Sequence, residues 1–204
     1  MISFIMLSSG VEKAWDILGK LDPSAVSNNA IVSYDSTDGY YIRSFCFDFY
    51  VKPPLKKISS DSSEGEMILK KYDYFFCHSC LWYLVYAKDL PFSKKLVAPS
   101  DIKGGSMFFR GSHVLPLDNL AKKYSNNKQA FLQKGEGLCA KKQHYGDASI
   151  ELFPFPRIPV TIILWEKDDE FPARADLLFD STCEMQLPID IIWSIAMLCV
   201  LVMM

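Results

Sequence analysis

The stretch from Met67 to Lys88 constrains the fold more than any other part of the sequence. It is long, with a few charges near its ends, and apolar residues lie on nearly every face of the helix that it would form. A helix that is hydrophobic all round has to be buried by other elements. The stretch therefore predicts a central buried helix against which the rest of the chain packs.

A second apolar run extends from Ile191 to Met204 and is interrupted only by Ser194. A membrane-spanning helix needs about 20 apolar residues, and no basic residue follows this run to hold it at a membrane face. Pro188 and Asp190 lie where a first helical turn would begin, and both residue types favour that position. We therefore expect a buried C-terminal helix and not a membrane anchor.

The spacing of apolar residues and of turn residues predicts the other elements. We expect a helix over 11–21, a hairpin from 31–34 and 40–51, a helix over 117–134 broken near 125–127, strands over 150–155 and 160–165, and a strand or short helix over 175–179. Residues 59–65 and 135–146 are expected to be loops, and 107–109 a short strand or buried loop.

Helices and strands are mixed without a regular βαβ rhythm, which favours an α+β fold. We predict a single domain over 1–204, with a mixed or antiparallel sheet packed on the central helix and an apolar C-terminal helix. Within it, residues 1–58 hold the N-terminal helix and hairpin.

The charge balance and the N-terminus restrict the possible partners. The 22 basic and 24 acidic residues give a net charge of −2, which offers no broad positive surface for nucleic acid. The first residues carry no basic leader for export. We therefore expect a cytoplasmic protein without nucleic-acid or membrane binding. Its six cysteines are expected to be thiols, because Cys46, Cys139 and Cys199 show no framework spacing.

Two cysteines in the central helix offer the first candidate site. Cys77 and Cys80 have the spacing of a zinc, iron–sulfur or redox pair. Cys139 and His144 are the nearest second pair of ligands, but the segment between the pairs is far longer than in compact zinc modules. The apolar neighbours of Cys77 and Cys80 favour packing in the core, since buried cysteine commonly acts as a small hydrophobe.

The densest polar cluster follows the strand expected at 160–165. We take five residues as a candidate ligand-binding set, in which carboxylates and guanidinium groups would orient a polar ligand: Arg157, Asp169, Glu170, Arg174 and Asp180. The alternative is structural, because polar residues among apolar ones often form a buried network that fixes the fold. An enzyme that uses Asp169 and Glu170 as general acid and base is a further hypothesis.

An ordered series of short motifs resembles prokaryotic proteins catalogued as domain of unknown function 3786. The motifs are Gly146-Asp147-Ala148, Phe153-Pro154-Phe155-Pro156-Arg157-Ile158-Pro159, Asp168-Asp169-Glu170-Phe171-Pro172-Ala173, Leu178-Phe179-Asp180 and Leu187-Pro188-Ile189-Asp190. A weaker likeness reaches back through Lys103-Gly104-Gly105 to the central helix, so the family-like region covers about 66–204.

The resemblance implies a source in anaerobic prokaryotes. Some relatives carry a cysteine-rich iron–sulfur segment that this chain lacks, and Trp82 stands where the resemblance implies a histidine before Tyr83. The leading hypothesis is a non-catalytic binding or accessory protein of anaerobic metabolism, linked to a corrinoid or iron–sulfur system, with a small cofactor or a protein as its partner. The carboxylate-pair enzyme and the Cys77/Cys80 metal or redox protein are the alternatives, and the sequence does not identify a cofactor.

Overall fold

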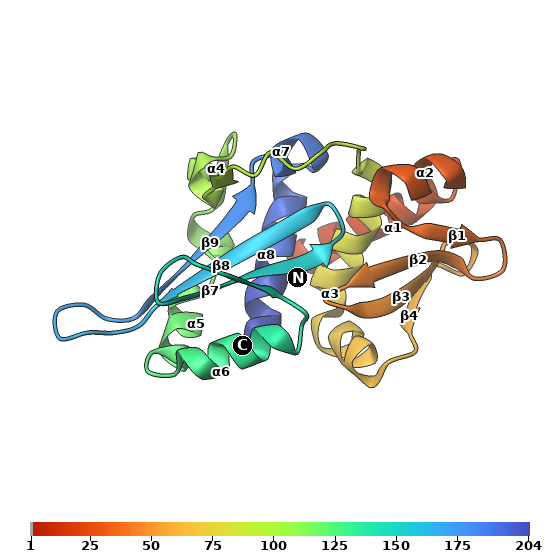
Figure 1. Cartoon of the computed structure of the whole chain (residues 1–204). Coiled ribbons are helices and arrows are strands. Elements are labelled where there is room, and N and C mark those ends of the chain that lie inside the picture. Colours follow the sequence, from red (N-terminus) through yellow and green to blue (C-terminus); the bar gives the residue numbers. More distant parts are fainter. Residues whose placement is uncertain (1) are drawn as a thin grey trace.

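The computed structural model describes the backbone of residues 2–204 and the side chains of residues 10–204. Two antiparallel sheets flank helices that lie near the centre of the molecule (Figure 1). The first sheet has the strand order β1-β2-β3-β4 and the second β5-β9-β8-β7-β6. The strands are β1 (Ser33–Asp35), β2 (Gly39–Ser44), β3 (Phe47–Lys52), β4 (Lys57–Ser60), β5 (Leu96–Val97), β6 (Lys141–Gln143), β7 (Ala148–Phe155), β8 (Ile158–Trp165) and β9 (Arg174–Asp180).

Eight α-helices are found in the described part of the chain. They are α1 (Ile2–Leu18), α2 (Pro23–Ala30), α3 (Ser63–Tyr86), α4 (Gly105–Phe108), α5 (Leu117–Tyr124), α6 (Lys128–Glu136), α7 (Cys183–Gln186) and α8 (Ile189–Met203). Short 3-10 turns occur at η1 (Pro53–Leu55), η2 (Pro99–Asp101) and η3 (Gly111–His113). The predicted α+β class is therefore confirmed, with the sheet component divided into two antiparallel sheets.

The predicted central helix is confirmed as α3. Its N-cap is Ser62, whose hydroxyl accepts a hydrogen bond from the Gly65 backbone N–H at 3.0 Å. The helix bends at Tyr72, where φ is −126° and ψ is 24°. Beyond this bend it is buried from His78 to Leu84 and contacts both α1 and α8. The apolar residues on all its faces are explained by these neighbours.

The apolar C-terminal run forms α8, as predicted, and packs in the core. Pro188 is its N-cap, and its buried residues include Ile192, Ile195 and Cys199. In Figure 1, α8 lies behind the strands of the second sheet. Among the described residues, no helix is both long enough and apolar enough to cross a membrane.

The strands predicted near the C-terminus are confirmed as β7, β8 and β9. In β8 every residue from Ile158 to Leu164 is buried, and the strand lies between β7 and β9 in the sheet. Residues 175–179 belong to a strand, β9, which resolves the open choice between strand and helix.

Several local expectations were wrong, and the causes are contacts between distant parts of the chain. Residues 40–51 form two strands, because Phe45 and Cys46 turn with φ of 50° and 62°. The Phe45 side chain is fully buried and its N–H donates to the Phe153 carbonyl at 3.0 Å. The expected loop at 59–65 contains the end of β4, where the Ser60 hydroxyl donates to the Asp48 carbonyl at 2.7 Å.

Three more differences have local causes. Helix α2 was not among the elements expected from the sequence. It begins after Asp22, whose carboxylate accepts from the Ala25 N–H at 3.0 Å, and proline suits the first helical position. The expected loop at 135–146 contains β6, an edge strand of polar residues that gives no hydrophobic signal. Residues 107–109 are neither strand nor buried loop, because Met107 lies in the short helix α4 and is 82% exposed.

The expectation that all six cysteines are thiols was also wrong. Cys46 and Cys139 form a disulfide, with their Cα atoms 5.6 Å apart and a sequence separation of 93. The bond connects the β2–β3 turn to the segment between α6 and β6. Cys77, Cys80, Cys183 and Cys199 are free. The disulfide therefore joins the first sheet to the second half of the chain.

Replacing Cys139 by alanine should lower the free energy of unfolding of the oxidised protein by about 2–4 kcal/mol, because the unfolded chain loses a long covalent loop. Denaturant unfolding would measure the loss, and peptide mapping without reductant would identify the linked peptides. The reduced wild type and the reduced variant should unfold alike. Full alkylation of Cys46 and Cys139 in the unreduced protein would contradict the assignment.

Candidate functional site

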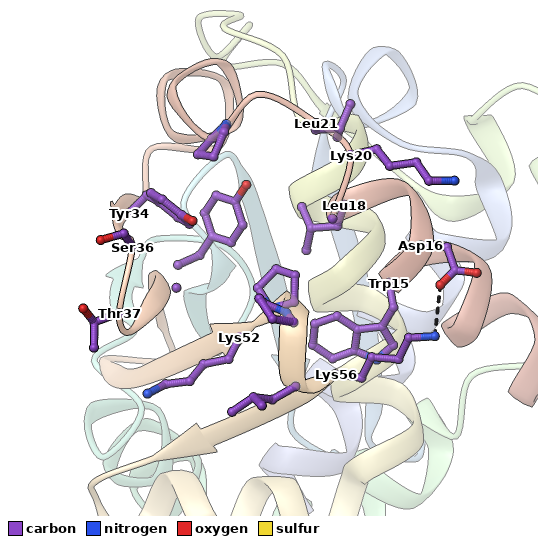
Figure 2. Close-up of a pocket in the computed structure, with 17 residues that line it drawn as sticks. Trp15, Asp16, Leu18, Lys20, Leu21, Tyr34, Ser36, Thr37, Lys52 and Lys56 are labelled. Carbon is purple, nitrogen blue, oxygen red and sulfur yellow. Dashed lines mark ion pairs between the residues drawn. The ribbon is translucent and has the colours of Figure 1, made fainter.

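A cleft with a cavity volume of about 680 Å³ lies between the end of α1 and the β1–β2 hairpin. Figure 2 shows its two walls: Trp15 and Leu18 come from the helix side, and Tyr34, Ser36 and Thr37 from the hairpin side. Tyr40 and the proline pair of η1, residues 53–54, also line the cleft. The cleft is therefore mainly aromatic and apolar inside, with polar groups at its edge.

The hairpin wall is shaped by turn chemistry. The Asp35 carboxylate accepts from the Thr37 N–H at 2.7 Å and from the Asp38 N–H at 3.1 Å, and these bonds lower its pKa. Gly39 then returns the chain with φ of +80°, and a Cβ there would lie 2.3 Å from the Val51 carbonyl oxygen. Only glycine fits this close approach without displacing β3. The sequence Asp35–Gly39 thus fixes the position of one wall.

Two lysines at the cleft are already paired with carboxylates. The Lys56 Nζ lies 2.6 Å from a Glu12 oxygen and 3.0 Å from an Asp16 oxygen, and these contacts raise the pKa of Lys56. The Lys52 Nζ lies 2.8 Å from an Asp38 oxygen. The charges at this edge are therefore largely balanced within the protein.

Tyr40 is the most buried aromatic residue of the cleft, with 1% of its surface exposed. Its ring centroid lies 4.9 Å from that of Tyr34. Burial raises the pKa of Tyr40 to about 12, and the nearby Tyr34 and Asp22 add to the effect. The hydroxyl is therefore protonated at neutral pH and available as a donor.

Arg157, the first of the residues predicted from the sequence, lies in the β7–β8 turn and is 8% exposed. Its Nε donates to the Asn29 carbonyl, and its terminal nitrogens reach the Asn28 and Leu90 carbonyls at 3.2 Å each. A fourth contact joins it to an Asp89 oxygen at 2.6 Å. All of these partners belong to the protein, so the guanidinium joins α2 to the segment after α3.

Asp180 ends β9 and is 4% exposed. Its carboxylate accepts hydrogen bonds from the backbone N–H and hydroxyl of both Ser93 and Thr182 and from the Lys94 N–H, over 2.7–3.1 Å. Burial alone would raise its pKa, but the bonds from Thr182 and Ser93 outweigh burial and lower it. Asp180 thus holds residues 93–94 against the end of β9.

Of the other three predicted residues, Asp169 and Glu170 lie in the β8–β9 loop and Arg174 is the first residue of β9. Asp169 and Glu170 are exposed, and Figure 1 shows this loop projecting beyond the second sheet. The neighbouring Asp168 accepts from the Glu170 and Phe171 N–H groups at 2.9 and 2.7 Å. Arg174 is paired across the strands with Trp165, and its guanidinium lies over that indole at 4.5 Å.

The structure does not bring these five residues together. Arg157 and Asp180 lie near one end of the β8–β9 pair, where Val160 is opposite Phe179, while Asp169, Glu170 and Arg174 lie at the other. The strands between them separate the two groups by on the order of 20 Å. No single ligand of ordinary size can contact both groups.

The four residues considered as metal ligands (Cys77, Cys80, Cys139 and His144) do not form one site either. The Cys77 thiol donates to an Asp73 oxygen at 3.1 Å, and Cys80 is fully buried. Burial raises both thiol pKa values, which makes these cysteines weak nucleophiles. Cys139 is in the disulfide, and His144 is exposed. The described residues contain no group of three or more histidine, cysteine or acidic side chains suited to a metal ion.

Trp82, which stands at the position where a histidine was expected, is 7% exposed and stacks on Tyr86 with ring centroids 5.2 Å apart. Its environment is aromatic packing. Tyr83 beside it is fully buried and bonded to backbone groups.

Residues 22–202 match the family described as Domain of unknown function (DUF3786). The chain belongs to this family. The resemblance inferred from the short motifs is thereby confirmed, and the matched region of the DUF3786 domain includes the first sheet as well as the second. No curated protein and no solved structure matches the chain.

The cleft combines residues from inside and outside the DUF3786 match. Tyr34 and Tyr40 lie within it, whereas Trp15 and Leu18 precede it. Sequence reasoning did not identify this site, because Trp15 and Leu18 fit the apolar face of a helix and Tyr40 fits a strand. The turn sequence Asp38-Gly39, between the two expected strands, is a local signal for a hairpin, but it does not indicate a cleft beside it.

Replacing Arg157 by methionine should lower the free energy of unfolding by about 2–4 kcal/mol, because three part-buried carbonyls would lose their donor. The matched variant Arg174→Met, at an exposed site, should change stability by less than about 1 kcal/mol. Denaturant unfolding of both variants tests the difference. An Arg157→Met protein as stable as the wild type would show that the network contributes little.

Asp180 should make the protein sensitive to acid. Because its pKa is lower in the folded state than in the unfolded state, the stability that it contributes is present above the unfolded value of about 3.9 and is lost as the pH falls through the folded value. An Asp180→Asn variant should therefore show a weaker decline of stability below about pH 4. The Asp169→Asn variant should keep the wild-type pH profile, measured by thermal unfolding.

Proposed function

We propose that this protein is a non-catalytic binding or accessory protein, and that a small molecule occupies the cleft between α1 and the β1–β2 hairpin. The observation that carries the proposal is a cavity of about 680 Å³ with aromatic walls. Small-molecule sites are typically mainly apolar clefts of about 300–1,000 Å³ with a few placed polar groups. The cleft has both properties.

The setting proposed for this role is anaerobic prokaryotic metabolism, with a corrinoid or iron–sulfur system as the process served and a protein partner that receives the ligand. What supports the setting is the source in anaerobic prokaryotes that the resemblance of the motifs implies; the family description itself assigns no function. The ligand of the cleft itself is proposed from its shape and chemistry alone.

Acid–base catalysis by Asp169 and Glu170 has less support. Both carboxylates are exposed in a projecting turn, and general acid–base groups are usually tuned by burial or by close neighbours. The Cys77/Cys80 redox hypothesis meets a similar objection, because both thiols have raised pKa values.

Filling the cleft with a large side chain tests the proposal. Ser36 is exposed in the hairpin turn and lines the cleft, so Ser36→Trp should obstruct it without disturbing the core. Ser100→Trp, at an exposed position in η2, is the matched control. Ligand-observed NMR with a pool of small ring compounds should find compounds that bind the wild type and Ser100→Trp, and Ser36→Trp should bind them at least about tenfold more weakly, a loss of about 1.4 kcal/mol.

Native mass spectrometry of protein purified without oxygen should be recorded on the same three samples. Bound mass that is retained by Ser100→Trp and lost by Ser36→Trp would identify a natural occupant of the cleft. The proposal is wrong if all compounds bind the three proteins equally, or if none binds.

A further inference from the structure

Tyr40 differs from the other deeply buried tyrosines in the use of its hydroxyl. The Tyr83 and Tyr124 hydroxyls donate to the Ala30 and Met203 carbonyls at 2.6 and 2.7 Å. No described residue forms a hydrogen bond with the Tyr40 hydroxyl, although Tyr40 is only 1% exposed. The Tyr40 oxygen is not among the fully buried side-chain atoms that lack a hydrogen-bond partner, so it is open to the cleft that Tyr40 lines. A ligand there can accept a hydrogen bond from it in place of water.

Trp15 carries a second side-chain donor of the cleft that has no hydrogen-bond partner among the described residues. The indole N–H groups of Trp165 and Trp193 donate to an Asp176 oxygen and to the His113 carbonyl, each at 2.8 Å. Trp15 is 5% exposed and lines the cleft, and no described residue accepts from its Nε1. An indole nitrogen can only donate. A ligand that pairs with Trp15 must therefore present an acceptor.

The walls of the cleft favour a flat ligand. Tyr34, Tyr40 and Trp15 contribute aromatic rings, and Pro53 and Pro54 contribute rigid apolar surface. Aromatic side chains pack against planar groups in offset or edge arrangements. A planar ring system can lie between the helix wall and the hairpin wall that Figure 2 shows facing each other.

The charges do not favour an anion. Lys52 is paired with Asp38, and Lys56 with Glu12 and Asp16, so an anionic ligand would compete with carboxylates already in place. Figure 2 shows the Lys20 side chain extending away from the hairpin wall. Apart from Lys20, the lysines that line the cleft are thus already paired with carboxylates.

We propose that the cleft binds a neutral, planar heteroaromatic molecule whose ring acceptors receive hydrogen bonds from the Tyr40 hydroxyl and the Trp15 indole N–H. This ligand class rests on the proposed function, since it concerns the same cleft. A hydrocarbon of the same shape would fill the walls but leave both donors unpaired, and the site should discriminate against it.

Three bicyclic probes of nearly equal shape test the ligand class: naphthalene, quinoline and 1,5-naphthyridine, which carry none, one and two ring nitrogens. Their affinities would be measured by ligand-observed NMR on the wild type and on Tyr40→Phe, which removes only the hydroxyl. The preference for quinoline over naphthalene should fall about three- to tenfold in Tyr40→Phe. The control Tyr145→Phe, at an exposed position, should keep the wild-type preference.

Two further measurements test the role of the Trp15 N–H and the effect of a negative charge on the ligand. Trp15→Phe keeps an aromatic ring but removes the N–H, so the preference for 1,5-naphthyridine over quinoline should fall by a similar factor. Quinoline-4-carboxylate should bind no more tightly than quinoline, at low or high ionic strength. Melting temperatures of all variants would identify any that fail to fold.

The possible failures are distinguishable. If the probes bind the wild type but not Ser36→Trp, and Tyr40→Phe and Trp15→Phe leave the preferences unchanged, the ligand class is wrong and the cleft remains a binding site. Markedly tighter binding of the carboxylate would also overturn the proposed class. If Ser36→Trp changes the binding of none of the probes or ring compounds, the proposed function itself fails.

Discussion

The fold depends on the position of the Tyr83 hydroxyl, where three parts of the chain meet. It donates to the Ala30 carbonyl at 2.6 Å and accepts from the Arg157 N–H at 3.2 Å, while the Tyr83 ring stacks on Phe155 at 4.9 Å. The Arg157 guanidinium extends this network to Asn28 and its neighbours. A buried network of this kind is stable only when every member is paired. Helix α3, the end of α2 and the β7–β8 turn are therefore fixed together.

This network also determines where the cleft can form. Helix α2 follows α1 and precedes β1, so both walls of the cleft are attached to its two ends. Its C-terminus turns at Ile31, with φ of 54°, immediately after the carbonyl that Tyr83 holds. Asp22 caps its N-terminus directly after the helix wall. The separation of the walls is thus set by interactions deep in the core, and the cleft side chains need not hold each other in place.

Sequence patterns predicted the elements that apolar periodicity controls, and missed those that depend on distant contacts. The runs that became α3, α8 and β8 could be read directly because burial on all sides leaves a continuous apolar pattern. The turn at Phe45-Cys46 could not, since a strand-like sequence is bent there by its contacts with Phe153 and Cys139. The contacts of Arg157 fit the structural alternative, in which the residue belongs to a polar network that fixes the fold. No described residue forms a hydrogen bond with the Tyr40 hydroxyl. The sequence cannot indicate this, because hydrogen-bond partners are decided by neighbours in space.

The two sheets are joined to each other away from the cleft. The Phe45 N–H to Phe153 carbonyl bond and the Cys46–Cys139 disulfide hold the β2–β3 turn against the second half of the chain. Strand β1 lies at the opposite edge of the first sheet, pairs with β2 alone, and is exposed at all three of its residues. Segments with few buried contacts open at low free-energy cost. The β1 edge of the hairpin wall is therefore the less deeply packed side of the cleft, while the helix wall is held by the core through Trp15 and Leu18.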